Sequence, residues 1–168
     1  MSDTAPGADR LRDLADQLAD RCLATGRRVV TAESCTGGLV GHTCTEVPGS
    51  STWFLGGVIA YADEVKQGVL GVPAETLAAH GAVSAQAAVA MADGVRRLLG
   101  ADLAVSVTGV AGPGGGSDAK PVGLTYIAVA DAVGHEVHRY VWPYDRSGNK
   151  RASAAAALEA LLARLGAA

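Results

Sequence analysis

The chain has 168 residues, a length that suits a single compact domain. Apolar residues make up 49% and aromatic residues only 4%, so the core must be built mainly from Ala, Val and Leu. A net charge of -3 with no long basic run argues against a nucleic-acid partner, and no apolar run approaches the ~20 residues of a membrane helix.

The first third of the chain predicts a helix, a strand and a second helix. Residues 1–9 are expected to form a disordered tail, and residues 10–168 a single domain. Apolar residues recur at helical spacing over 11–22, and a glycine ends this amphipathic helix. A buried strand is predicted over 27–32. Two glycines then open a helix over 37–46.

Strands and helices continue to alternate and then give way to a hairpin. A strand over 56–61 is followed by a helix for which Asp63 is the predicted N-cap. Ser84 is predicted to cap a longer helix, which Gly100 stops. The remaining predicted elements are, in order, a strand over 102–108, a glycine-rich loop over 110–121, hairpin strands over 122–130 and 135–142, and a helix over 151–165.

This order of elements predicts an α/β fold, a three-layer α/β/α sandwich whose mixed sheet is mostly parallel with one antiparallel strand. In open sheets of this kind, ligands bind beyond the carboxyl ends of the strands. Three unusual segments lie at such ends: ESCTGG, YADEVK and TGVAGPGGGS. If their strands are parallel, the three segments meet at one edge of the sheet.

Ser34 is a candidate nucleophile because it lies at the turn between a buried strand and a helix. Gly37 and Gly38 let the backbone pass close to a ligand, and N–H groups from Thr36 to Gly38 can hold an oxyanion. The arrangement resembles a nucleophile elbow in logic, although the GxSxG pattern is absent. The alternative is that Ser34 and Thr36 only cap the helix, and the short motif by itself favours this alternative.

A serine nucleophile needs a base, and Lys66 fits this role better than the four histidines. His135 and His138 are expected on opposite faces of one strand, which also disfavours a metal site there. His42 is placed in a helix and His80 in a turn. A free lysine has a pKa of about 10.4, so Lys66 must be desolvated or lie near another cation to act as a base. The alternative is an ordinary solvated lysine.

Thr108 ends the third strand, where its hydroxyl can relay a proton or bind substrate. The glycine-rich loop after it lacks the Walker pattern, and a flexible surface turn is its alternative role. Cys35 has no matched histidine or resolving cysteine and is predicted to pack. The three cysteines lack CxxC spacing, which disfavours a disulfide framework or a zinc site and indicates a reducing, cytoplasmic compartment.

Long ordered motifs over about residues 10–165 resemble the CinA C-terminal domain family. They are TAESCTGGLV, VPGSSTWFLGGVIAYADEVKQGVLGV, HGAVS, MADGVRRLLGADLAVSVTGVAGPGGGSDAKPVG and YDRSGNKR. The resemblance implies a nicotinamide-nucleotide amidohydrolase (NMN deamidase), which converts nicotinamide mononucleotide (NMN) to nicotinic acid mononucleotide and ammonia in pyridine nucleotide recycling. It also implies that no metal or cofactor takes part. We expect the stand-alone form, without the amino-terminal domain of two-domain members.

The resemblance also assigns residues. It implies that Ser34 is the nucleophile and Lys66 the general base, with Tyr61 and Thr108 also catalytic. The predicted substrate-binding residues lie in the same three segments and in the YDRSGNKR stretch, whose basic residues could meet a phosphate: Glu33, Cys35, Thr36, Gly37, Gly38, Gly109, Ala111, Gly112, Arg146 and Arg151.

One stretch departs from the family pattern. Members usually show Gly-Asp-Arg and then an aliphatic residue, whereas this chain has Tyr144 and Asn149 at those positions. If the stretch holds phosphate, the preference for a nucleotide is altered. The expected partners are NMN and further copies of the chain, as a homo-dimer or higher oligomer, with no nucleic acid or membrane.

Three other functions stay open. The first is a Ser-Lys amidase that acts on a different small amide. The second is a non-catalytic module that only binds a nucleotide. The third, a role in DNA uptake or recombination, comes from the family's name, and the lack of a basic run speaks against direct contact with DNA.

Overall fold

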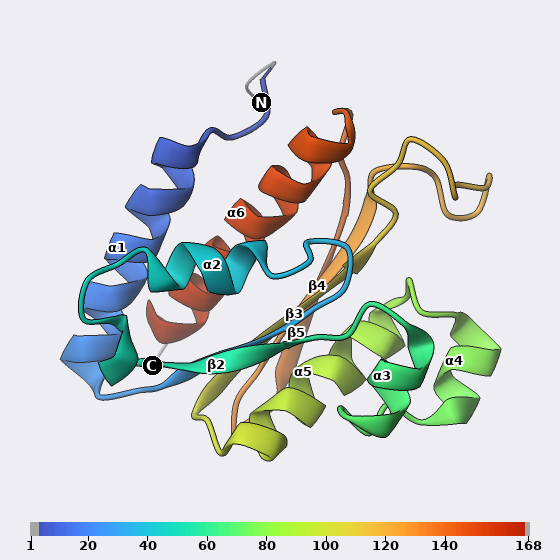
Figure 1. Cartoon of the computed structure of the whole chain (residues 1–168). Helices are drawn as coiled ribbons and strands as arrows, with labels where there is room; N and C mark the ends of the chain where they lie inside the picture. The colour runs from blue at the N-terminus through green and yellow to red at the C-terminus, as the bar shows by residue number, and fades with distance from the viewer. Residues whose placement is uncertain (1–3, 167–168) are drawn as a thin grey trace.

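The computed structural model describes residues 4–166 and contains a five-stranded sheet with helices on both faces (Figure 1). The strand order is β2-β1-β3-β4-β5. The strands are β1 (Val29–Glu33), β2 (Phe54–Ile59), β3 (Leu103–Gly109), β4 (Leu124–Ala130) and β5 (His135–Val141). The helices are α1 (Ala8–Thr25), α2 (Leu39–Thr45), α3 (Asp63–Gly68), α4 (Ala74–His80), α5 (Ala85–Leu99) and α6 (Arg146–Gly166), and η1 (Ser50–Thr52) is a 3-10 turn.

The predicted fold class is confirmed. Strand β1 pairs in parallel with β2 and with β3. Strand β4 is antiparallel to both β3 and β5, so within the described chain it alone runs against the other four. Helices α1, α2 and α6 cover one face of the sheet, and α5, with α3 and α4, covers the other (Figure 1). These are the three layers that the sequence predicts.

The burial of each strand follows from its place in the sheet. All five residues of β1 are buried, because the strand is central and helices pack on both of its faces. Val29 packs into the cluster beneath α1, α2 and α6, and Val30 into the cluster beneath α5. Strand β5 lies at an edge, and most of its residues are exposed. A buried central strand therefore delivers Ser34 to the end of the sheet.

Several element boundaries differ from the predictions. Helix α6 begins at Arg146 instead of 151, so Asn149 is helical, whereas Tyr144 precedes the helix. His80, which was placed in a turn, is the last residue of α4, a helix that the sequence did not predict. Asp63 is the first residue of α3 and Ala62 its N-cap. The predicted cap Ser84 is confirmed, since its side chain accepts a hydrogen bond from the Ala87 N–H.

The beginning of the chain is more ordered than the predicted tail. Helix α1 starts at Ala8, so the last two residues of the predicted 1–9 tail are helical. The Pro6 carbonyl accepts a hydrogen bond from Arg151 Nε at 2.9 Å. Residues 1–3 lie outside the described residues. Among residues 4–166, no helix combines the length and the apolar character that a membrane span requires.

Candidate active site at the carboxyl ends of three strands

The three predicted segments do meet at one edge of the sheet. Glu33, the last residue of β1, lies opposite Ile59 of β2 and Val107 of β3 in the parallel ladders. The Ala60 N–H donates to the Glu33 carbonyl at 2.8 Å, and the Ser34 N–H donates to the Val107 carbonyl at 2.9 Å. Ser34 therefore emerges between the ends of β2 and β3.

Glu33, a predicted substrate-binding residue, instead holds the turn that carries Ser34. Its carboxylate is buried and accepts hydrogen bonds from the N–H groups of Gly38 at 3.0 Å, Val40 at 3.1 Å and Gly41 at 2.8 Å. Gly38 has a φ of 97°, which only glycine adopts without strain. The buried carboxylate thus fixes the entry into α2 from inside the protein.

The two backbone N–H groups directly after Ser34 find no hydrogen-bond acceptor in another described residue. The Gly37 N–H donates to the Ser34 carbonyl at 3.1 Å, and the Gly38 N–H is taken by Glu33. Among the described residues, the N–H groups of Cys35 and Thr36 have no acceptor from another residue. The predicted oxyanion donors at Gly37 and Gly38 are therefore already occupied, and the free donors lie one and two residues after Ser34.

The Ser34 side chain is only 8% exposed, and its hydroxyl has no hydrogen-bond partner within residues 4–166. Lys66 is 1% exposed, although it is a lysine in the last turn of the short helix α3. Its Nζ lies 2.9 Å from the Tyr61 carbonyl and 3.4 Å from Asp63 Oδ1. Lys66 is thus held at the end of β2, next to the strand end that carries Ser34, and in this structure it does not hydrogen-bond to Ser34.

Arg146 joins the other two segments. Its Nη1 donates to the Gly112 carbonyl at 2.6 Å, and its Nη2 to the Tyr61 hydroxyl at 3.4 Å. Tyr61 is itself 62% exposed. Arg146 therefore ties the start of α6 to the glycine-rich loop and to the segment after β2, as expected of a residue at the rim of the site.

The rest of the glycine-rich loop is held by its backbone. The Ala111 carbonyl accepts from Asn149 Nδ2 at 3.0 Å, while Asn149 Oδ1 accepts from the Tyr144 N–H at 3.1 Å. A Cβ on Gly109 would lie 2.6 Å from the Leu124 carbonyl oxygen, so only glycine fits there. Of the two residues that depart from the family pattern, Asn149 thus fastens α6 to this loop, and the Tyr144 N–H bonds to the same Asn149 side chain.

Thr108 and Cys35 are buried beside Ser34. The Thr108 hydroxyl donates to the Ala82 carbonyl at 2.8 Å, so it can take part in a relay only as an acceptor. Burial raises the pKa of the Cys35 thiol to about 12, and Glu33 adds to the rise, while Lys150 and Lys66 partly oppose it. A thiol with so high a pKa is a poor nucleophile, which agrees with the packing role predicted for Cys35.

The structure does not bring Arg151 to this edge. Its Nε donates to the Pro6 carbonyl, and the side chain lines a groove beside α1. The preceding residue, Lys150, was not predicted as a site residue, yet its Nζ lies 3.8 Å from the position that a Cβ on Gly37 would take. Its spacing of four residues from Arg146 places both side chains on one helix face, and this signal could have identified it.

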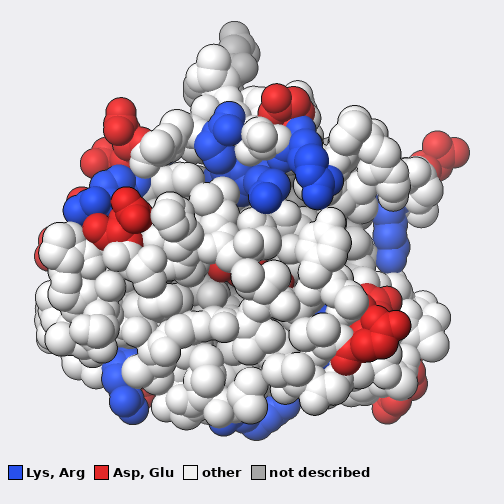
Figure 2. Space-filling view, in the orientation of Figure 1, with Lys and Arg blue, Asp and Glu red and all other residues white. Residues whose placement is uncertain are grey.

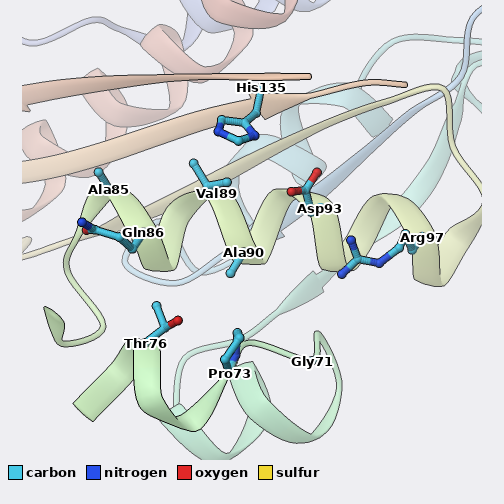
Figure 3. Close-up of a pocket in the computed structure, with 10 residues that line it drawn as sticks. All are labelled: Gly71, Pro73, Thr76, Ala85, Gln86, Val89, Ala90, Asp93, Arg97 and His135. Atoms are coloured by element: carbon cyan, nitrogen blue, oxygen red, sulfur yellow. The ribbon is translucent and has the colours of Figure 1, made fainter. Parts of the chain in front are cut away.

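A cavity of about 490 Å³ lies elsewhere, along the outer side of α5 between α4 and the start of β5 (Figure 3). It is lined by Thr76, Val89, Asp93 and His135 among others, and none of its ten lining residues is a predicted site residue. Among residues 4–166, no group of three or more His, Cys, Asp and Glu side chains is placed to hold a metal ion.

The sheet and its strand ends define an open α/β protein. At one edge it carries a buried lysine, and a serine hydroxyl and two backbone N–H groups that have no partner in another residue of the described chain. The model of the CinA C-terminal domain matches residues 11–165. The chain belongs to the CinA C-terminal domain family, and the resemblance found in the sequence motifs is confirmed.

Named relatives and solved structures agree with this assignment. The chain is 54% identical to a CinA-like protein of Synechococcus over 129 residues, 76% of this chain and 31% of that protein. It is 43% identical to a CinA-like protein of Leptospira borgpetersenii over 164 residues, 97% of this chain and 39% of that protein. The chain spans about a third of the length of the curated relatives it matches.

Two crystal structures cover nearly the whole chain. A competence-damaged protein (CinA) superfamily protein from Klebsiella pneumoniae superposes with a TM-score of 0.91 at 34% identity, over 94% of this chain and 99% of that chain. The competence/damage inducible protein CihA from Agrobacterium tumefaciens gives a TM-score of 0.88 at 41% identity, over 99% of each chain.

Proposed function

We propose that this chain is an amidohydrolase that deamidates nicotinamide mononucleotide to nicotinic acid mononucleotide and ammonia. The observation that carries the proposal is the group of functional atoms at the end of β1. The Ser34 hydroxyl has no partner among residues 4–166, the next two N–H groups have no acceptor in another residue, and the Lys66 amine lies at the neighbouring strand end. These are the nucleophile, oxyanion donors and base that acyl transfer needs.

The reaction begins with neutral Lys66, which takes the Ser34 proton as Oγ attacks the carboxamide carbon. Lys66 must turn from the Tyr61 carbonyl toward Ser34, because catalytic hydrogen bonds often form only when substrate binds. The N–H groups of Cys35 and Thr36 hold the oxyanion, as the residue after the nucleophile does in nucleophile elbows. Lys66 returns the proton to the leaving ammonia, and water then hydrolyses the acyl-enzyme to free the acid and Ser34.

The three cysteines fit the cytoplasmic location that we propose with this function. Cys22, Cys35 and Cys44 are unpaired and buried, and no disulfide is present among the described residues. Free thiols of this kind are typical of proteins in reducing compartments.

Ammonia release from NMN, measured on the purified wild type and on Ser34→Ala, tests the proposal. Without its nucleophile, the Ser-Lys pair no longer contributes to catalysis. We therefore expect kcat to fall by about 10³-fold or more. Ser51→Ala, which removes an exposed hydroxyl from η1, is the matched control and keeps its activity. Circular dichroism establishes that both variants fold. Undiminished turnover by Ser34→Ala refutes the nucleophile.

Two variants of Lys66 separate a base from a mere positive charge. Arginine keeps the charge but stays protonated in proteins, so Lys66→Arg and Lys66→Met should both be inactive. An active Lys66→Arg contradicts general-base catalysis by this residue. A panel of other small amides, assayed beside NMN, shows whether the carboxamide of a nucleotide is the preferred substrate.

A further inference from the structure

The cavity along α5 lies apart from the Ser34 edge, and its charged groups have no partners in the described chain. It encloses about 490 Å³, which is within the range of small-molecule sites. The side chains of Asp93, Arg97 and His135 line it, and none of the three forms a hydrogen bond or an ion pair with any of residues 4–166. Asp93 and Arg97 are four residues apart on α5, a spacing at which opposite charges commonly pair. Both charges therefore remain available to a ligand.

The lining of the cavity changes along α5 from neutral polar to apolar to charged (Figure 3). Gln86 lies at one end, where Thr76 of α4 faces α5. Val89 and Ala90 follow along the helix, and Pro73 lies across the cavity from Ala90. From residue 86 to residue 97 the helix extends about 16 Å, at about 1.5 Å per residue. A ligand that fills the cavity is therefore elongated, with an apolar part in its middle.

The charged end of the cavity matches a phosphate next to a ribose. The Arg97 guanidinium can hold a phosphate through two parallel N–H hydrogen bonds. A carboxylate, here that of Asp93, accepts hydrogen bonds, and ribose hydroxyls are donors that carboxylates bind in nucleotide sites. Figure 2 shows basic side chains at the lower margin, where α5 ends, well apart from those gathered over the start of α6. Apolar surface, carboxylate and guanidinium thus follow one another along α5 in the order of the base, ribose and phosphate of a nucleoside monophosphate.

The turn between α4 and α5, residues 81–84, connects the walls of this cavity to the candidate active site. The Thr108 hydroxyl donates to the Ala82 carbonyl at 2.8 Å. Lys120 Nζ, at the exit of the glycine-rich loop, donates to the carbonyl of His80, the last residue of α4, at 2.6 Å. A Cβ on Gly81 would lie 2.7 Å from Lys120 Nζ, so this close contact requires glycine. A change in how α4 lies against α5 therefore moves groups that hold Thr108 and the glycine-rich loop.

We propose that the cavity along α5 is a regulatory site for a nucleoside monophosphate, separate from the site at Ser34. Arg97 binds the phosphate, Asp93 binds the ribose hydroxyls, and the apolar stretch of α5 receives the base. A nucleotide that contacts both α4 and α5 restrains the turn between them, and with it Thr108 and the glycine-rich loop. The binding site stands without the proposed amidohydrolase function, whereas an effect of the nucleotide on turnover rests on it.

The test uses AMP, which lacks the carboxamide that the proposed reaction hydrolyses and so is not consumed. Calorimetry measures its binding, and amide hydrogen exchange shows where it binds. AMP should protect amides of α4 and α5, and it should bind at least about 10-fold more tightly than adenosine or ribose 5-phosphate, because each of these lacks one of the matched groups. Arg97→Gln should weaken AMP binding by about 10- to 100-fold, and Arg97→Lys should restore part of it. Arg21→Gln, which removes an exposed charge from α1, is the matched control and should leave AMP binding unchanged.

Equal affinity of Arg97→Gln and Arg21→Gln for AMP would overturn the site, and so would protection confined to the turn at Ser34. NMN turnover with and without AMP tests the regulation, and we expect a change of about fivefold or more, which Arg97→Gln removes. Unchanged turnover with AMP bound would overturn the regulatory role. A wild type that releases no ammonia from NMN refutes the proposed function alone. In that case the exchange of the glycine-rich loop decides the regulation: AMP that protects the loop supports it, and AMP that leaves the loop unchanged overturns it.

Discussion

Replacing Glu33 by glutamine tests whether the buried carboxylate holds the turn at Ser34. In the wild type, Oε2 accepts from the N–H groups of Gly38 and Val40, and Oε1 accepts from that of Gly41. A glutamine offers one acceptor oxygen, so its NH2 group faces at least one of these donors. One buried unsatisfied N–H costs about 1–3 kcal/mol, and the remaining bonds lose their charge assistance. Because the desolvation of a buried charge disfavours folding, its removal offsets part of this effect. We therefore expect the free energy of unfolding to fall by about 2–3 kcal/mol.

Urea unfolding followed by circular dichroism measures the change in the free energy of unfolding. The matched control is Glu75→Gln, an exposed carboxylate in the first turn of α4, which should change stability by less than about 0.5 kcal/mol. We also expect Glu33→Gln to lower turnover, because the donors after Ser34 shift with the turn. If Glu33→Gln is as stable as Glu75→Gln, the carboxylate does not hold the turn and the reasoning fails.

Three further predictions concern other parts of the molecule. The Arg164 guanidinium beside Asp131 holds the pKa of that carboxyl well below its usual range. The pair therefore stabilises the fold above pH 3.9, which is about the pKa of the carboxyl in the unfolded chain. This stabilisation is lost progressively as the pH falls below that value. Asp131→Asn should lower the free energy of unfolding by about 1–2 kcal/mol at pH 7. Its difference in Tm from the wild type should shrink below about pH 4. A difference in Tm that does not change with pH would contradict this prediction. A Cβ on Gly94 would meet the Leu70 carbonyl oxygen, so Gly94→Ala should destabilise α5 by about 1–2 kcal/mol despite the higher helix propensity of alanine. Gly68→Ala, which meets nothing, is its control in thermal unfolding, and equal stability of the two variants would rule out the clash. Burial raises the pKa of each of the three thiols, so a disulfide reagent at pH 8 should modify them only after unfolding in urea, and rapid modification of the folded protein would be inconsistent with their burial.

The candidate site divides into a part that sequence patterns predict and a part that they do not. Ser34, Lys66 and Thr108 follow strand ends, and parallel strands bring such ends together, so their common edge was predictable. The role of Glu33 was not predictable, because its three partners are backbone N–H groups whose direction depends on the turn. Lys150 lies four residues after Arg146, a spacing that places both on one face of a helix, but only the structure shows that its Nζ approaches Gly37.

The sequence alone determined the fold class and the order of most strands and helices. Its local patterns raised Ser34 and Lys66 as candidates, and the family resemblance selected them as nucleophile and base. Hydrophobic periodicity, helix caps and strand-end motifs are local signals. They indicate which elements form and which of their residues are buried. Only the tertiary structure decided which N–H groups stay free after Ser34, which basic residue faces the Gly37 turn, and that Arg151 turns toward Pro6. These facts depend on how α6 packs against α2, β3 and β4 and bonds to the glycine-rich loop. Such contacts join segments that are distant in the sequence, so no periodic pattern of residues predicts them.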